Sequence, residues 1–213
     1  MSQRRVWVVV VAAGSGDRFG GPKQLAPLGD ARVIDHAVAA ASAVADGVVV
    51  VVARALADSI TESLPGDVCV VGGATRSASV RSGLAAVPDD ADIVLVHDAA
   101  RPLASMALFE RVVAAVDDGA DAVVPVVAVT DTIRRGRGGV VDRDDLWSVQ
   151  TPQGFRADAL RSAHAGGGEA TDDATLVEAE GGKVVLVDGE PTNFKITHAH
   201  DLRVAQALVG EHR

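Results

Sequence analysis

The chain has 213 residues, and 48% of them are hydrophobic, which suits one α/β domain with a sizeable core and argues against global disorder. The net charge of −9, from 29 acidic and 20 basic residues, argues against a non-specific nucleic-acid binder, because such proteins present basic surfaces. The single cysteine, Cys69, rules out an intrachain disulfide and a cysteine-cluster metal site.

The N-terminal segment places two arginines before an apolar run, as a signal peptide does. This run leads straight into a glycine-rich turn and is not followed by a cleavage-site pattern, so we interpret it as the first buried strand. No apolar run approaches the roughly 20 residues that are needed to span a bilayer. We therefore expect a cytoplasmic protein that does not span a membrane.

Short valine-rich runs alternate with alanine-rich stretches along most of the chain. The valine-rich runs are continuously apolar, as expected of strands that are covered on both faces. They predict strands at Val6–Ala13, Val48–Ala53, Val68–Val71, Ile93–His97 and Ala122–Val127. The stretches between them predict helices at Ala31–Val44, Ala55–Leu64, Ser77–Val87 and Ser105–Asp117. This alternation is typical of an α/β fold with a doubly wound, mainly parallel sheet, which binds ligands at the carboxyl ends of its strands.

Residues 128–150 interrupt this alternation. Two β-like segments flank the glycine-rich turn Gly136–Gly139 and predict a protruding hairpin, or β-arm. An isolated hairpin is only marginally stable, so we expect the arm to contact a second subunit. Beyond the arm, the pattern predicts helices at Arg156–His164, Asp172–Glu180 and Asp201–Val209 and a strand at Val184–Val187. No repeat or long linker divides the chain, so residues 1–213 are expected to form one domain.

The segment after the first strand is rich in glycine, which permits positive φ angles and lets backbone N–H groups converge on an anion. A dinucleotide fingerprint fits it poorly, because Phe19 replaces the third glycine and no acidic residue ends the second strand. A P-loop also fits poorly, since Pro22 precedes Lys23 and Gln24 has no hydroxyl for Mg²⁺.

The remaining alternatives for this segment are an ordinary connection and an open loop that folds over a triphosphate. Arg18 and Lys23 favour the second alternative, because two cations lie close together at a strand's carboxyl end in an acidic chain. The chain has only three lysines, Lys23, Lys183 and Lys195. A lysine in such a loop indicates a site that needs a compact point charge.

Two further turns follow predicted strands at the same edge of the sheet. In the segment 72–79, Thr75 or Ser77 is suited to cap the following helix. In the segment 97–102, Asp98 is suited to orient Mg²⁺ or to bind a ribose or polyol hydroxyl, and Arg101 is suited to pair with Asp98 or with a phosphate. A simpler alternative is that these two residues only shape the turn.

The loop sequence AAGSGDRFGGPKQ at 12–24 resembles the signature of the cytidylyltransferases that act on 2-C-methyl-D-erythritol 4-phosphate in non-mevalonate isoprenoid synthesis. Seven further motifs follow in the order in which that family carries them, over nearly the whole chain. They are GGATRSASVRSGL (72–84), VHDAARP (96–102), DT (131–132), VDR (141–143), TPQGF (151–155), TDDA (171–174) and NFKIT (193–197).

The resemblance implies a Rossmann-like nucleotidyltransferase that transfers CMP from CTP to the methylerythritol phosphate, and a homodimer with exchanged arms. It assigns cytosine binding largely to backbone groups of two turns, with a contribution from the Ser79 side chain. The expected CTP-binding residues are Ala12, Ala13, Gly14, Ser15, Gly16, Gly73, Ala74, Ser79 and Asp98. The expected acceptor-phosphate ligands are Arg101, Thr132, Arg143 and Thr151, with Thr132 and Arg143 donated by the neighbouring subunit's arm.

The implied reaction is attack by a phosphate on the α-phosphorus of CTP, and it needs no general base. The second pKa of a phosphomonoester is near 6, so its oxygen is already anionic at neutral pH. The site must supply positioning and positive charge for the leaving pyrophosphate, and Arg18, Lys23 and Lys195 are the expected catalytic cations. The expected cofactor is Mg²⁺, held mostly by the triphosphate, with Asp98 as the candidate protein ligand. His97 is therefore expected to be structural.

Other functions remain open on the sequence. A ribitol 5-phosphate cytidylyltransferase shares the loop, fold and chemistry, and the acceptor arm carries the difference. A regulatory module that binds CTP without turnover is disfavoured, because it would not need acceptor contacts such as Arg143. An NAD-dependent oxidoreductase is disfavoured because the dinucleotide fingerprint is incomplete. Asp172 and Asp173 suit a helix start, and no role is assigned to His198 or His200.

Overall fold

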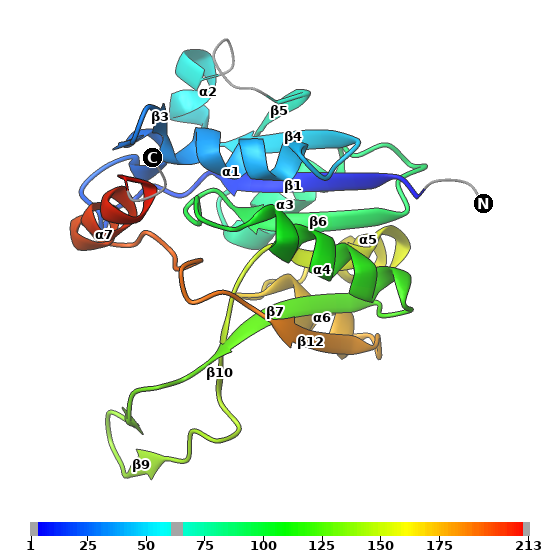
Figure 1. The fold of residues 1–213 in the computed structure, drawn as a ribbon. Helices are drawn as coiled ribbons and strands as arrows, with labels where there is room; N and C mark the ends of the chain where they lie inside the picture. Colours follow the sequence, from blue (N-terminus) through cyan, green and yellow to red (C-terminus); the bar gives the residue numbers. More distant parts are fainter. Residues whose placement is uncertain (1–3, 61–65, 211–213) are drawn as a thin grey trace.

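The structure is a computed structural model, which describes residues 4–60 and 66–210. A central sheet lies between two layers of helices, and a thin arm projects from one end of it (Figure 1). The strands of the sheet are β1 (Val6–Ala12), β4 (Gly47–Val52), β5 (Val68–Val71), β6 (Ile93–Asp98), β7 (Ala122–Ala128), β10 (Trp147–Val149), β11 (Gln153–Arg156) and β12 (Val184–Asp188). The α-helices are α1 (Val33–Ser42), α2 (Arg54–Ile60), α3 (Arg76–Leu84), α4 (Met106–Asp117), α5 (Ala157–Ala165), α6 (Asp173–Ala179) and α7 (Ala199–Gly210).

Most strand pairs of the sheet are parallel. β1 lies between β4 and β6, and β5 extends the sheet beyond β4, all in parallel register. β12 is parallel to β7, whereas β10 and β11 run antiparallel to β7. The predicted doubly wound, mainly parallel sheet is confirmed. The antiparallel strand β11, which joins β6 to β7, was not predicted, because four residues including a glycine show no strand periodicity.

The central strands are buried on both faces, as their continuous apolar runs predict. Val8 and Val10 belong to the core cluster that contains α1 and α4. Val9, between them, belongs to the opposite cluster, which contains α3, α5 and α6. Alternate residues of β1 therefore anchor different helix layers, which fixes the carboxyl end of the strand between them.

Several helix boundaries differ from the predictions for identifiable reasons. The helix predicted from Ala31 begins at Val33, because Ala31–Arg32 (β3) pairs with Pro27–Leu28 (β2). The last predicted helix begins two residues early, at Ala199, since Asp201 accepts hydrogen bonds from the backbone N–H groups of residues 197 and 198. The part of the second predicted helix at 61–64 lies outside the described residues. In the described parts of the chain, no helix has the length and apolar character to cross a membrane.

The β-arm contains the short antiparallel strands β8 (Ile133–Arg134) and β9 (Val140–Val141), which flank the predicted glycine turn. It extends far from the sheet (Figure 1). Large apolar side chains of the arm are exposed, including Val140 at 60% and Trp147 at 49%. The arm therefore presents apolar surface that its own subunit leaves uncovered.

The glycine in β11 leads to the first testable prediction. A Cβ atom at Gly154 would lie 2.4 Å from Val112 Cγ1 and 3.0 Å from Leu95 Cδ2, so α4 packs against bare backbone. We expect Gly154→Ala to lower the free energy of unfolding by about 1–3 kcal/mol, the usual cost of overpacking. Gly136→Ala in the arm is the control, because a Cβ there meets nothing within 4 Å. Equal urea midpoints for the two variants would contradict this packing.

Candidate active site

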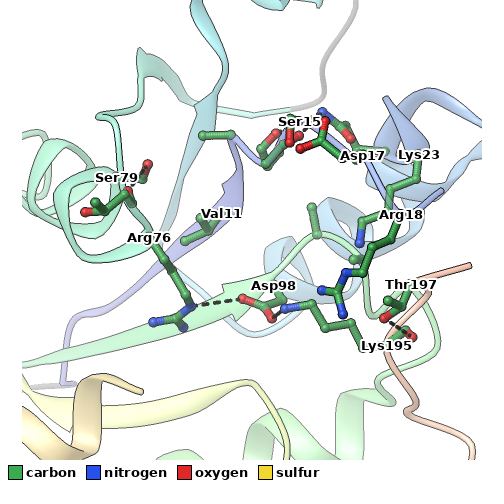
Figure 2. A pocket seen from close by; sticks show the side chains of 18 of the residues that line it. Val11, Ser15, Asp17, Arg18, Lys23, Arg76, Ser79, Asp98, Lys195 and Thr197 are labelled. Carbon is green, nitrogen blue, oxygen red and sulfur yellow. Dashed lines mark hydrogen bonds and ion pairs between the residues drawn. The ribbon is translucent and has the colours of Figure 1, made fainter. Parts of the chain in front are cut away.

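A cavity of about 570 Å³ opens at the carboxyl ends of β1 and β6 (Figure 2). Its walls are the loop after β1, the turn before α3, the end of β6 and the segment before α7. All the residues predicted to bind CTP line this cavity, and so do the three predicted catalytic cations. The fold thus brings together residues from four separate motifs at the sheet edge where ligands bind in such folds.

The loop after β1 turns at Gly16, which no other residue type could replace without strain. Its φ angle is +76°, and a Cβ atom there would lie 1.9 Å from the carbonyl oxygen of Gly21. The Gly16 carbonyl accepts hydrogen bonds from the backbone N–H groups of Phe19, Gly20 and Gly21. The loop therefore closes on itself and returns Lys23 to the cavity.

The short 3₁₀ helix η1 (Lys23–Leu25) fixes the returning end of this loop. Gln24 is 3% exposed, and its side-chain amide donates to the carbonyl oxygens of Ala12 at 3.1 Å and Gly14 at 3.4 Å. The sequence excluded Gln24 as an Mg²⁺ ligand but did not reveal this role. The glutamine joins η1 to the end of β1 and so holds the neighbouring lysine in place.

Arg18, Lys23 and Lys195 extend toward the same region of the cavity (Figure 2). The pKa of Lys23 is lowered by burial and by the nearby positive charges of Lys195 and Arg18. Such mutual repulsion is unfavourable without a counter-ion, so this part of the cavity favours an anion. The sequence interpretation, an open loop whose cations fold over a phosphate, agrees with this geometry.

Asp98, at the end of β6, lies on the floor of this cationic region. Its Oδ2 is 2.5 Å from Lys195 Nζ, and its Oδ1 is 3.4 Å from Arg76 Nε. Burial alone would raise the pKa of Asp98, but the positive charges of Lys195, Arg76 and Arg101 outweigh it and hold the pKa well below its ordinary value. Asp98 is therefore ionised at neutral pH and orders the cations in the site.

On the side of the cavity formed by Ala13 and Ser79, the loop after β1 and the turn before α3 approach each other closely. A Cβ atom at Gly72 would lie 2.6 Å from Ala13 Cβ and 2.7 Å from Ser79 Oγ. The Ser79 hydroxyl donates to the carbonyl oxygen of Thr75 at 2.8 Å, and Thr75 itself caps α3 through the N–H of Ala78. Close backbone approach thus forms the wall for which the resemblance implies cytosine binding.

The predicted acceptor ligands Thr151 and Arg101 lie beside the cavity rather than in its lining. The Thr151 hydroxyl accepts from the backbone N–H of Asp98 at 3.0 Å and is 3.1 Å from His97 Nδ1. The Arg101 guanidinium donates to the carbonyl oxygens of Asn193 at 2.7 Å and Val149 at 3.0 Å. Both side chains hold together β6, the base of the arm and the segment that carries Lys195.

The other two predicted acceptor ligands lie on the arm. Thr132 directly precedes β8 and Arg143 follows β9, so both lie at the end of the hairpin away from its glycine turn. Both side chains are exposed, and the Arg143 guanidinium donates to the carbonyl oxygen of Thr130. Neither residue lines the cavity of its own subunit, so one chain alone does not bring them to the catalytic cations.

Sequence reasoning missed Arg76, which lines the cavity and pairs with Asp98. It also pairs with Asp173, which the sequence assigned only to a helix start; Asp172 does cap α6, through the N–H of Ala174. The only sequence signal for Arg76 was its position in the motif at 72–84, at the first residue of α3. An arginine exposed to solvent at a helix start has the same sequence pattern, so this position did not identify Arg76 as a site residue.

Few acidic side chains line the cavity. Among the described residues, no group of three or more histidine, cysteine or acidic side chains is placed to hold a metal ion. Asp17 and Asp98 are the acidic residues in the lining. A divalent cation bound here would therefore have few protein ligands and would take most of its coordination from substrate and water.

A glycine-rich loop, converging cations and one ionised carboxylate at the carboxyl edge of a parallel sheet define a nucleotide-binding α/β enzyme of the phosphoryl-transfer class. The sequence pattern of the family "IspD: 2-C-methyl-D-erythritol 4-phosphate cytidylyltransferase" matches residues 6–211. The chain therefore belongs to the IspD family. It is an enzyme of the nucleotidyltransferase class, and the predicted transfer of CMP from CTP to 2-C-methyl-D-erythritol 4-phosphate is confirmed.

Individual relatives agree with this membership. The chain is 49% identical to a 2-C-methyl-D-erythritol 4-phosphate cytidylyltransferase from Rhodococcus jostii, over 97% of this chain and 96% of the relative. It is 45% identical to a bifunctional enzyme IspD/IspF from Rhodospirillum rubrum, over 96% of this chain and 57% of that protein. The crystal structure of the cytidylyltransferase from Thermus thermophilus superimposes with a TM-score of 0.80 at 38% identity, covering 98% of this chain and 100% of that one.

His97 is fully buried next to Asp98 and contacts Arg101 and Thr151 in its neutral form. The Arg101 carbonyl, 3.2 Å from Nε2, can only accept, so Nε2 carries the proton while Nδ1 faces the Thr151 hydroxyl. The pKa of His97 is lowered from 6.5 to about 4, mainly by burial; the Asp98 charge opposes this shift and the Arg101 charge contributes to it.

This pKa shift gives a second prediction. Between pH 6.5 and about 4 the unfolded chain binds a proton at His97 that the folded chain does not, so stability rises with pH across this window. On going from pH 7 to pH 4, the wild type should lose about 3 kcal/mol more free energy of unfolding than His97→Gln. The measurement is urea unfolding at a series of pH values, with His200→Gln, which removes an exposed histidine, as the control. Parallel pH profiles for wild type and His97→Gln would rule out a buried neutral imidazole.

Proposed function

We propose that the cavity performs the cytidylyl transfer by neutralising charge, with Arg18, Lys23 and Lys195 surrounding the triphosphate of CTP. The observation that supports this most directly is the convergence of these three cations on one cavity of an acidic protein. Among the described residues of the lining there is no histidine or cysteine to act as a base or nucleophile. A site of this composition suits a reaction in which the attacking group is already an anion.

The acceptor phosphate oxygen attacks the α-phosphorus, forming one P–O bond as the bond to the β-phosphate oxygen breaks. Because the second pKa of the acceptor phosphate is near 6, this oxygen is mostly deprotonated at neutral pH. Negative charge grows on the bridging oxygen and leaves with pyrophosphate. Lys23 and Arg18, on the closed loop, and Lys195, held by Asp98, are placed to balance that charge.

Mg²⁺ is the proposed divalent cation, with the triphosphate as its main ligand and Asp98 as its protein ligand. When bound, it neutralises phosphate charge and orients the triphosphate. Lys195 and Arg76 each engage one carboxylate oxygen of Asp98, so a metal ion bound there would share these oxygens with the two cations.

The proposed active unit is a cytoplasmic homodimer in which each arm completes the other subunit's site. Thr132 and Arg143 are exposed on the arm and remote from the lining of their own cavity. Exposed Val140 and Trp147 provide apolar surface for the contact. A partner arm would then supply the acceptor-phosphate ligands, while Arg101 and Thr151 fix its base in each subunit.

The role of the loop lysine gives a third prediction. Lys23→Ala should lower kcat roughly 10²–10³-fold, because the lost contact acts on charge that develops in the transition state. Lys183→Ala removes the same charge outside the cavity and is the matched control, with an expected wild-type rate. The assay is pyrophosphate release from CTP with 2-C-methyl-D-erythritol 4-phosphate and Mg²⁺. A wild-type rate for Lys23→Ala would eliminate the proposed chemistry.

A fourth prediction tests the shared site by mixing two inactive variants. One variant, Lys23→Ala, lacks the cavity cation and keeps its arm. The other variant, Arg143→Ala, keeps the cavity cation and lacks the arm cation. If arms are exchanged, mixed dimers contain one site in which both residues are intact, and equal random mixing should restore about a quarter of wild-type activity. If each chain uses its own arm, every mixed-dimer site lacks one residue and the mixture stays inactive.

A further inference from the structure

A line of ion pairs and hydrogen bonds extends from the cavity into the helix layer behind it. Arg76 is the first residue of α3, and its Nε faces Asp98 Oδ1 at 3.4 Å. Its Nη1 is 2.5 Å from Oδ2 of Asp173, the first residue of α6. Asp173 Oδ1 is in turn 3.1 Å from Nε2 of His164, in α5. Four residues from four elements thus form one connected network.

The far end of this network is more deeply buried than the end at the cavity. The side chain of Asp173 is 1% exposed and that of His164 is 3% exposed, whereas that of Arg76 is 23% exposed. Neither Asp173 nor His164 lines the cavity. Asp173 is fixed by its burial and by its contact with His164, away from the cavity, so it offers the Arg76 guanidinium an anchor within the helix layer.

The near end of the network determines how Asp98 presents its two oxygens. Arg76 faces Oδ1 and Lys195 Nζ faces Oδ2, so the carboxylate lies between two cations that approach from opposite walls (Figure 2). A rotation of the carboxylate would weaken both contacts at once. The planar guanidinium is suited to this position, because its separate N–H groups reach two carboxylates in a fixed geometry.

We propose that Arg76 is a positioning residue, which is anchored on the buried Asp173 and fixes the orientation of Asp98 and, through it, the position of Lys195. This inference rests on the proposed function, since it assigns a partner to the catalytic Lys195. Arg76 then acts on the rate of the chemical step through Asp98. An arginine that bound the nucleotide directly would act mainly on the KM for CTP.

The test is a double-mutant cycle between Arg76 and Asp173, read as kcat and as KM for CTP. Arg76→Met and Asp173→Asn are each expected to lower kcat roughly 10- to 100-fold, with a much smaller change in the KM for CTP. In the double variant, Asp173→Asn should add almost nothing to the loss caused by Arg76→Met. Arg76→Lys should recover part of the rate, because a point charge balances one carboxylate but does not span both.

Arg81→Gln is the matched control in the same helix. Arg81 binds Glu169 at 2.7 Å and the carbonyl oxygen of Gly168 at 2.9 Å, and it does not line the cavity. This variant should turn over at the wild-type rate. If Asp173→Asn does not fold, His164→Gln replaces it in the cycle; it keeps the Arg76–Asp173 pair but removes the contact that fixes Asp173, so a smaller loss of kcat is expected.

Three outcomes would overturn the positioning role. They are a wild-type kcat for Arg76→Met or for the anchor variant, losses that multiply in the double variant, and a loss confined to the KM for CTP. These outcomes are distinct from a failure of the proposed function. If the wild type and Arg81→Gln release no pyrophosphate with 2-C-methyl-D-erythritol 4-phosphate, the function itself is wrong.

Discussion

The attraction between Asp98 and the cations around it is the interaction on which the rest of the site depends. Without an ionised carboxylate at the end of β6, the neighbouring charges of Arg76, Lys195 and Lys23 would repel one another with no counter-ion among them. Asp98 stays ionised because those charges outweigh its burial. The site is thus held ready for a highly charged ligand in a protein whose net charge is −9. The oxygens of a triphosphate can replace part of the ion pairing between Asp98 and these cations.

The fold supplies the fixed positions that this balance needs. β1 and β6 lie side by side in parallel register, with Val11 opposite Asp98, so the glycine loop and the carboxylate begin from the same edge. Helices anchored on both faces keep that edge rigid. Gln24 then joins the returning loop to β1, and Arg101 joins the Lys195 segment to the base of the arm. Cations that are distant in the sequence are therefore held in place by the strands and by side-chain hydrogen bonds to backbone carbonyl groups.

Features with a periodic or local signature could be predicted from the sequence, whereas features made by long-range contacts could not. The continuous apolar runs revealed the parallel strands, and the glycines with Arg18 and Lys23 revealed the loop. β11 escaped prediction because four residues carry no period and are set by the flanking strands. The pairing of Arg76 with Asp173, 97 residues apart, left no trace that distinguishes it from two ordinary helix starts. For Thr132 and Arg143 the family resemblance was the sole indication, because a solvated hairpin has the same pattern.

The most direct measurement of the central claim is a crystal structure of the protein with CTP and Mg²⁺. We expect the triphosphate to lie inside the glycine loop, with the side-chain nitrogens of Arg18, Lys23 and Lys195 within hydrogen-bond distance of phosphate oxygens. A triphosphate that lies outside the loop, with none of these three nitrogens in contact with a phosphate oxygen, would contradict this expectation.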